Sequence, residues 1–381
     1  MKRLAESEKV IKKPRNLFKN SYKKKIEQNK VCKNPNTEYR NTKQILMETE
    51  MSRTLKVLLC SDDDGLMVKT IKNALSNKGF EANIVLVRDQ HDADTISKEI
   101  VDADVVYPDK AIITKEMIES AKKTRLFQFG TGYDTIDLAS AGERKIPVCN
   151  MPGITAQSVA EHAMYLVLAL ARNDREYGLE MKEGRWNRGV GVELAGKTLG
   201  LIGFGNIGKI KARIAHGIGM KTVAFRRNKE KGNEGLNFVD IVGFDHLLEK
   251  SDIVSILLPL IEHGSYRTKG IIGKRELEKI GGAGLGWLIN ISRGPIVNEK
   301  DLIESLKSNI IRKAALDVYE MEPLPENSEL RKLPNVILTP HIAGETREAL
   351  VRRYTLIAEN TIKVMNNERP LYIVKELQSI F

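Results

Sequence analysis

The sequence of 381 residues has few cysteines and no long apolar run, and each shortage excludes a class of protein. The three cysteines, Cys32, Cys60 and Cys149, show no C-x-x-C spacing, which excludes a disulfide scaffold and a cysteine-based zinc site. The longest apolar run, residues 163–171, is far shorter than the roughly 20 residues of a membrane-spanning helix. We therefore expect a cytoplasmic protein in a reducing compartment, with no membrane span and no metal.

Basic residues outnumber acidic ones, but the excess lies in one part of the chain. Of the net charge of +11, the first 54 residues carry +9 and the others only +2. Residues 1–52 are rich in lysine and asparagine and have too few large apolar residues to fold. We expect a disordered basic tail, or a leader ahead of a translation start at Met51. Nucleic acid would bind only through this tail, with a salt-sensitive affinity, and we do not expect the folded part to bind it.

Short apolar strands alternate with helical segments from Leu55 onward, which predicts a doubly wound parallel α/β sheet. The expected strands of this first sheet are residues 55–60, 82–87, 105–106, 126–129 and 148–149, with helices at 68–75, 93–99 and 115–121.

A second strand–helix series follows a long apolar-rich helix at 157–172 and a charged, glycine-rich connection at 174–193. Six strands are expected in this second sheet, at residues 198–202, 222–225, 253–257, 287–291, 314–316 and 336–338. A last helix at 348–365 is expected to return to the first sheet.

A glycine pattern between the first strand of the second series and the helix after it predicts a dinucleotide site. The pattern G-x-G-x-x-G comprises Gly203, Gly205, Asn206, Ile207 and Gly208 around Phe204. In this context the glycines permit a tight turn, approach of the backbone to a diphosphate and close packing of the helix, whose positive end faces the diphosphate. The glycine-rich stretch 281–286 instead precedes a strand, so we expect a loop there.

The residues that follow the next strand indicate which dinucleotide is preferred. NAD-specific folds carry an acid there, which accepts hydrogen bonds from the ribose 2′-hydroxyl. This chain has Arg226 and Arg227 instead. Because guanidinium groups match phosphate oxygens in geometry and charge, the sequence predicts a preference for NADP(H), with NAD(H) possible. The alternative is that the two arginines form only a solvated basic strand end.

Three residues at the ends of later strands are candidates for catalysis. Arg293, Glu322 and His341 follow strands whose carboxyl ends meet at the edge where open α/β sheets bind ligands. His341 suits an acid/base that titrates near neutral pH, and Arg293 suits a carboxylate. Taken singly, a residue such as Arg293 or Glu322 is more often a solvated charge at a loop than a catalytic group. We expect His162, on the apolar helix, to be a packing residue.

The order and spacing of these motifs resemble the D-isomer-specific 2-hydroxyacid dehydrogenase family. The matching pieces include residues 130–137, 150–153, 158–162, 203–208, 290–294, 316–323 and 340–341. The resemblance implies a Rossmann NAD(P)-binding domain at 154–344 inserted into a flavodoxin-like substrate domain at 53–153 and 345–381.

The resemblance also assigns roles to residues. Arg293 would hold the substrate carboxylate and carbonyl oxygen, and His341 would give a proton to that oxygen, supported by Glu322. Backbone amides of Gly130, Thr131 and Gly132 would bind the carboxylate from the other domain. The remaining implied cofactor residues are Pro259 and Asp317, the latter near the nicotinamide amide.

The resemblance is closest to glyoxylate and hydroxypyruvate reductases. The phosphoglycerate enzymes of the family carry an arginine in the loop after the third strand, where this chain has only Lys110, and no regulatory domain is expected after Met365. We therefore expect hydride transfer between NADP(H) and a small 2-keto acid or D-2-hydroxy acid, with D-3-phosphoglycerate dehydrogenase activity as the alternative. A dinucleotide-sensing corepressor is the less favoured alternative, because Ile342 and the residues after it lack the expected tryptophan. A homodimer is implied through the apolar helix.

Overall fold

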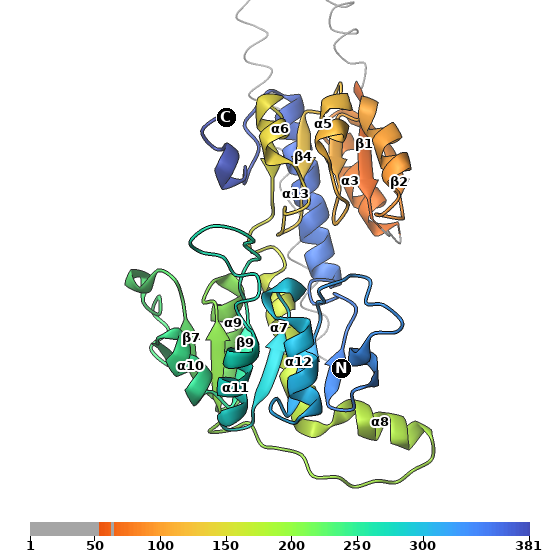
Figure 1. Ribbon diagram of the computed structural model, residues 1–381. Coiled ribbons are helices and arrows are strands. Elements are labelled where there is room, and N and C mark those ends of the chain that lie inside the picture. Colours follow the sequence, from red (N-terminus) through yellow and green to blue (C-terminus); the bar gives the residue numbers. More distant parts are fainter. Residues whose placement is uncertain (1–52, 62–64) are drawn as a thin grey trace, which may run out of the picture. The chain divides into compact units, whose positions relative to one another are not determined.

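The computed structural model describes residues 53–61 and 65–381, and the residues from Thr54 to Phe381 form one compact unit with two parallel β-sheets (Figure 1). The predicted basic tail, residues 1–52, lies outside the described residues. None of the helices in the described part of the chain is long and apolar enough to cross a membrane.

The first sheet has five parallel strands in the order β2-β1-β3-β4-β5. Its strands are β1 (Arg53–Cys60), β2 (Phe80–Val87), β3 (Val105–Tyr107), β4 (Leu126–Gln128) and β5 (Val148–Cys149). The order is that of flavodoxin-like folds, as the sequence predicts. Every residue of β3 and β4 is buried, because helices cover both faces of a parallel sheet.

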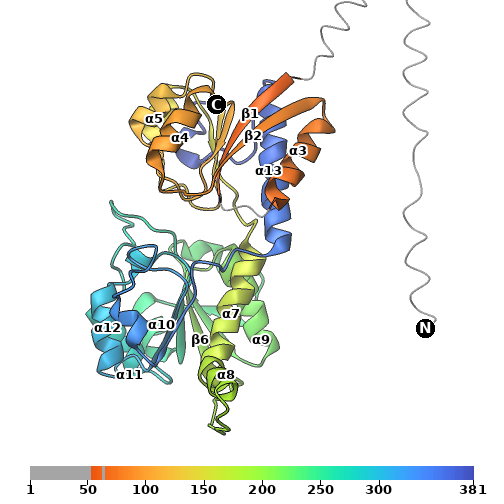
Figure 2. The same ribbon diagram turned by 90° about the vertical axis from the view of Figure 1, so that its right-hand side faces the viewer.

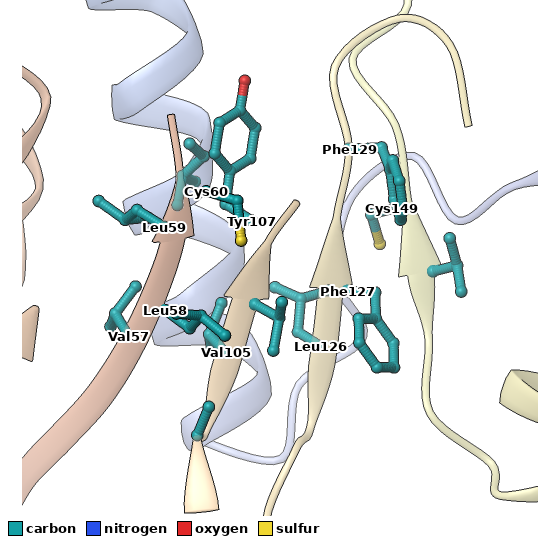
Figure 3. Packing of buried hydrophobic residues seen from close by; sticks show 14 of the residues in the cluster. Val57, Leu58, Leu59, Cys60, Val105, Tyr107, Leu126, Phe127, Phe129 and Cys149 are labelled. Atoms are coloured by element: carbon teal, nitrogen blue, oxygen red, sulfur yellow. The ribbon is translucent and has the colours of Figure 1, made fainter. Parts of the chain in front are cut away.

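The core of this sheet consists of aliphatic and aromatic side chains from neighbouring strands. Figure 3 shows Leu58, Tyr107, Phe127 and Cys149 packed along the sheet, and none of them is exposed to solvent. Each large apolar side chain buried in this way stabilises the fold by about 1.5–3 kcal/mol relative to its exposed state. This rigid layer positions the loops that follow β3 and β4.

Helices flank the first sheet on both sides, with α3 and α13 on one side and α4 and α5 on the other (Figure 2). Their bounds are α3 Leu66–Ser76, α4 Ala93–Glu99, α5 Lys115–Ser120, α6 Leu138–Glu143 and α13 Arg347–Met365. Asp92, Thr114 and Thr346 cap the N-termini of α4, α5 and α13 by accepting a hydrogen bond from a first-turn amide. The chain returns through α13, as the sequence predicts.

The second sheet has seven parallel strands in the order β12-β11-β10-β9-β6-β7-β8. They are β6 (Thr198–Ile202), β7 (Lys221–Phe225), β8 (Val239–Ile241), β9 (Ile253–Ile256), β10 (Trp287–Asn290), β11 (Lys313–Leu316) and β12 (Val336–Leu338). Counted from β6, this is the Rossmann order, whose direction of winding changes between β6 and β9. Ligands of such sheets bind in the crevice at that point.

Two groups of helices cover the second sheet on opposite faces (Figure 2). One face carries α7 (Ala156–Arg172) and α9 (Asn206–Gly217), and the other carries α10 (Phe244–Lys250), α11 (Lys274–Gly282) and α12 (Glu299–Lys307). Short 3-10 turns are η2 (Ile100–Asp102), η3 (Lys229–Lys231), η4 (Gly294–Ile296), η5 (Glu329–Lys332) and η6 (Lys375–Leu377).

Three expectations for the second half of the chain are wrong. The sheet has a seventh strand, β8, which is a three-residue edge strand with an exposed aspartate, Asp240, and no apolar run. The connection 174–193 begins with a helix, α8 (Asp174–Lys182), which buries no residue and so has no apolar stripe to reveal it. Gly281 and Gly282 belong to the end of α11, and only the residues after them form a loop.

Candidate active site

The three residues predicted to be catalytic lie in one cleft with a volume of about 790 Å³. Arg293, Glu322 and His341 follow β10, β11 and β12, and all three line this cleft. The opposite wall comes from loops of the first sheet and includes Gly132 and Lys110. The site therefore lies at the carboxyl ends of parallel strands, where ligands bind in open α/β sheets.

His341 and Glu322 form a close pair. Nδ1 of His341 lies 2.7 Å from Oε2 of Glu322, and Oε1 of Glu322 accepts a hydrogen bond of 3.1 Å from the backbone amide of Tyr319. Burial alone would raise the pKa of Glu322, but the hydrogen bond and charge of His341 outweigh burial and hold the pKa below its ordinary value. The hydrogen bond predicted between these two side chains is present, and it leaves Nε2 of His341 for a ligand.

The backbone of His341 adopts a left-handed conformation, with φ of 54°, which non-glycine residues rarely adopt. A buried acid holds this turn. Asp317 is fully buried and accepts hydrogen bonds from the amides of Ile342 at 3.0 Å and Ala343 at 2.9 Å, and from the hydroxyl of Thr339 at 2.6 Å. The family resemblance implies a position for Asp317 near the nicotinamide amide. In the structure both of its oxygens hold the turn that carries His341.

His162 takes part in the same network, so packing is not its only contribution. Its Nε2 lies 3.2 Å from the hydroxyl of Thr339 and 3.6 Å from the carboxylate of Asp317. The carboxylate can only accept, so Thr339 donates its one proton to Asp317 and must accept from His162. Nε2 of His162 therefore carries a hydrogen. Burial lowers the pKa of His162 and the charge of Asp317 only partly compensates, which favours the neutral ring.

Arg293 lies in a turn that the side-chain amide of Asn290 holds. Asn290, at the end of β10, accepts from the amide of Ser292 at 3.1 Å and donates to the carbonyl of Arg293 at 3.1 Å. A Cβ on Gly294 would lie 1.9 Å from the backbone of Tyr319, so only glycine permits this close approach. The turn of Arg293 and the segment leading to Glu322 are thereby in contact.

The guanidinium of Arg293 faces the glycine loop whose amides, by the family resemblance, are expected to bind the carboxylate. Its Nη2 lies 2.1 Å from the position that a Cβ on Gly132 would take, and 3.7 Å from Oδ1 of Asp134. Gly130 has open space where its side chain would be, and the carbonyl of Thr131 accepts from Asn150 at 3.3 Å. Arg293 and the loop 130–132 can therefore contact one small anion together.

The glycine turn after β6 has the geometry that a diphosphate requires. Gly203 has φ of 108°, and a Cβ there would lie 2.6 Å from the carbonyl oxygen of Leu257. A Cβ on Gly208 would lie 2.7 Å from the carbonyl oxygen of Gly203. Gly205 faces open space, which allows the backbone to approach a ligand. Helix α9 begins directly afterwards at Asn206 and includes Ile207, so its positive end is available to a diphosphate.

The two arginines predicted to read the ribose differ in their surroundings. Arg226 follows β7, lies above the ring of Phe204 and donates to Glu234 at 2.7 Å and to the carbonyl of Gly232 at 2.8 Å. The guanidinium carbon of Arg227 lies 4.3 Å from the ring centre of Tyr266. Glu234 was not predicted, because a loop contact of this kind leaves no pattern in a sequence.

The remaining predicted residue, Pro259, is exposed just beyond β9 and its carbonyl accepts from Thr268 at 2.7 Å. Sequence reasoning did not place Gln90 and His91 in the site, although both line the cleft beside Lys110. They follow β2 and carry no motif. No cluster of three or more potential metal ligands occurs within residues 53–61 and 65–381.

Comparisons with known proteins identify the family of the chain. The model of the D-isomer specific 2-hydroxyacid dehydrogenase NAD-binding domain matches residues 164–343. Glyoxylate reductase from Korarchaeum cryptofilum is 36% identical over 271 residues, which are 69% of this chain and 80% of that protein. Hydroxypyruvate reductase from Thermotoga maritima is 37% identical over 276 residues, 71% of this chain and 87% of that protein.

Two further comparisons bear on substrate and fold. D-3-phosphoglycerate dehydrogenase from Archaeoglobus fulgidus is 37% identical over 263 residues, 68% of this chain but only 49% of that enzyme. The structure of the pyruvate reductase of Chlamydomonas reinhardtii has a TM-score of 0.71 and 28% identity, and covers 84% of this chain and 99% of that one.

The chain therefore belongs to the D-isomer specific 2-hydroxyacid dehydrogenase family. It is an oxidoreductase that uses a nicotinamide dinucleotide and acts on CH–OH donors.

Proposed function

We propose that this enzyme reduces a small 2-keto acid, such as glyoxylate or hydroxypyruvate, to the hydroxy acid of D configuration, with NADPH as its preferred reductant. The observation that carries the proposal is the joint presence of the His341–Glu322 pair and Arg293 in one cleft, opposite the glycine loop 130–132. A carboxylate-binding cation and a supported acid/base are the groups that a 2-keto acid requires.

Each residue of the proposed site has a distinct role in the reaction. When bound, the dinucleotide would supply hydride chemistry at the carbonyl carbon. Arg293 and the amides of Gly130–Gly132 orient the keto acid by its carboxylate, and Arg293 also polarises the carbonyl oxygen. His341 gives that oxygen a proton as negative charge develops on it, and Glu322 stabilises the cationic ring beforehand. In the reverse direction His341 removes the proton from the hydroxyl.

The proposed preference for NADPH rests on the end of β7. The positions that hold an acid in NAD-specific folds are occupied by Arg226 and Arg227. Gly203, Gly205 and Gly208 would accept the diphosphate together with the start of α9. Asp317 would affect the nicotinamide site indirectly, because its carboxylate holds the turn that carries His341.

A small substrate is favoured over a phosphorylated one. The loop after β3 offers the cleft one cation, Lys110, and the fork of an arginine suits a phosphate better. D-3-phosphoglycerate dehydrogenase activity remains the second candidate, because Lys110 lies in the same cleft as His341.

We propose further that residues 53–153 with 345–381 form the substrate domain and 154–344 the cofactor domain.

We also propose a homodimer that forms through α7, α8 and the loop after them. Four large apolar side chains are exposed there: Leu168 (43%), Leu179 (59%), Trp186 (79%) and Val190 (89%). Cys60 and Cys149 are buried free thiols, which is typical of a reducing compartment such as the cytoplasm.

A spectrophotometric panel tests the proposal. Glyoxylate, hydroxypyruvate, pyruvate and 3-phosphohydroxypyruvate are each assayed with NADPH and with NADH at constant ionic strength. We expect the highest kcat/KM for glyoxylate or hydroxypyruvate with NADPH. A clear preference for the phosphorylated acid would favour the second candidate, and oxidation of neither nucleotide by any keto acid would overturn the proposal. Light scattering after size exclusion measures the mass of the assembly.

A further inference from the structure

One acidic side chain lies among the cations beside the glycine turn. The carboxylate of Glu234 contacts two cations at once, with Oε1 at 2.7 Å from Nη1 of Arg226 and Oε2 at 2.7 Å from Nζ of Lys209. The two contacts hold the pKa of Glu234 at about 2, so the group is ionised throughout the range in which an enzyme is assayed.

This ion triad lies where a dinucleotide presents its adenosine ribose. Lys209 follows Gly208 in α9, and Arg226 follows β7 with its guanidinium over the ring of Phe204, inside the glycine turn. In Rossmann folds the residue at this strand end reads the 2′ position of the ribose. The carboxylate of Glu234 bridges these cations. It carries the negative charge and accepts the hydrogen bonds that a 2′-phosphate would otherwise provide and accept.

We propose that Glu234 is a specificity-determining residue that weakens binding of 2′-phosphorylated dinucleotides. A phosphate that approaches Arg226 meets a fixed negative charge, and it must either lie beside that charge or displace it from both cations. Nη1 of Arg226 already donates to Glu234 and to Gly232, which leaves fewer donors for a phosphate. A 2′-hydroxyl meets neither obstacle. The preference for NADPH set by the arginines is therefore smaller than it would be without Glu234.

The inference rests on the proposed binding of a dinucleotide at this turn. The binding of nucleotide fragments tests the role of Glu234 separately from catalysis. Isothermal titration of the full chain measures the Kd of adenosine 2′,5′-bisphosphate and of 5′-AMP, which differ only in the 2′-phosphate. In Glu234→Gln we expect the Kd of the bisphosphate to fall at least tenfold, whereas the Kd of 5′-AMP changes less than twofold. The ratio of kcat/KM for NADPH to that for NADH rises in parallel.

Glu230→Gln is the matched control. Glu230 lies four residues earlier in the same loop, is exposed, and takes part in none of the ion pairs found within the described residues. This substitution removes the same charge from a side chain that makes no ion pair with Arg226, so both Kd values should stay within twofold of wild type.

Two results overturn the inference. An unchanged or weaker bisphosphate affinity in Glu234→Gln, with 5′-AMP still bound, means that Glu234 only holds the loop, and the proposed function stands. Failure of the wild-type protein to bind either fragment contradicts dinucleotide binding at this turn, and the proposed function falls with the inference.

Discussion

Lys211 gives the sharpest prediction about stability. It lies in α9 with no exposed surface, and its ammonium donates one hydrogen bond, 2.7 Å long, to the hydroxyl of Ser255 in β9. No carboxylate among the described residues pairs with it. Burial lowers the pKa of Lys211 from 10.5 to about 7, because the charged form loses its hydration.

The size of the effect follows from the two pKa values. In the unfolded chain Lys211 keeps its proton up to about pH 10.4, whereas the folded protein releases it near pH 7. Between these values the unfolded state binds more protons, so stability rises with pH. The lysine costs about 5 kcal/mol well below pH 7, about 4 kcal/mol at pH 7, about 2 kcal/mol at pH 9, and almost nothing above about pH 10.5.

Lys211→Met keeps the volume of the side chain and removes the charge. We expect the variant to be more stable than wild type by about 3–5 kcal/mol at pH 6.5, after about 1 kcal/mol is lost with the hydrogen bond to Ser255. At pH 9 the gain should shrink by about 3 kcal/mol. Urea unfolding at both pH values measures it, with Lys250→Met, at an exposed position of α10, as the control. An equal gain at both pH values, or a less stable variant, would refute the reasoning.

Two further substitutions test the site. Thr339→Val breaks the connection from His162 to Asp317, and we expect kcat to fall about tenfold with KM for the keto acid nearly unchanged, since an unmade buried hydrogen bond costs about 1–3 kcal/mol. Thr339→Ser should restore kcat, and a serine variant as slow as the valine variant would argue against the network. Arg293→Lys keeps the charge but not the fork, and should raise KM for the keto acid by about 10- to 100-fold at unchanged NADPH affinity by fluorescence titration. An unaltered KM would remove Arg293 from substrate binding.

The sequence was informative wherever a local pattern encodes the structure. Short apolar runs of two to six residues between helical segments predicted both parallel sheets, since buried parallel strands are apolar on both faces. The glycine spacing predicted the turn at Gly203, because its φ and the nearness of Leu257 tolerate no side chain. Arg293, Glu322 and His341 were found because the ends of parallel strands converge on one edge.

Features that depend on tertiary contact could not be predicted. The helix α8 buries no residue, and the edge strand β8 has the exposed Asp240 at its centre, so neither shows the apolar pattern of a buried element. Lys211 appears in the sequence as an ordinary lysine of a basic helix, and only packing of α9 on the sheet buries it. Glu234 and His162 act through partners 8 to 177 positions away in the chain, which one sequence cannot reveal.

The central claim is that His341, supported by Glu322, transfers the proton that accompanies hydride transfer in this cleft. It is tested most directly by kcat for hydroxypyruvate reduction in His341→Ala, with NADPH affinity measured by fluorescence on the same preparation. The account predicts a fall in kcat of about 10²- to 10⁴-fold with NADPH bound as tightly as by wild type. A variant that reduces hydroxypyruvate at the wild-type rate would contradict it.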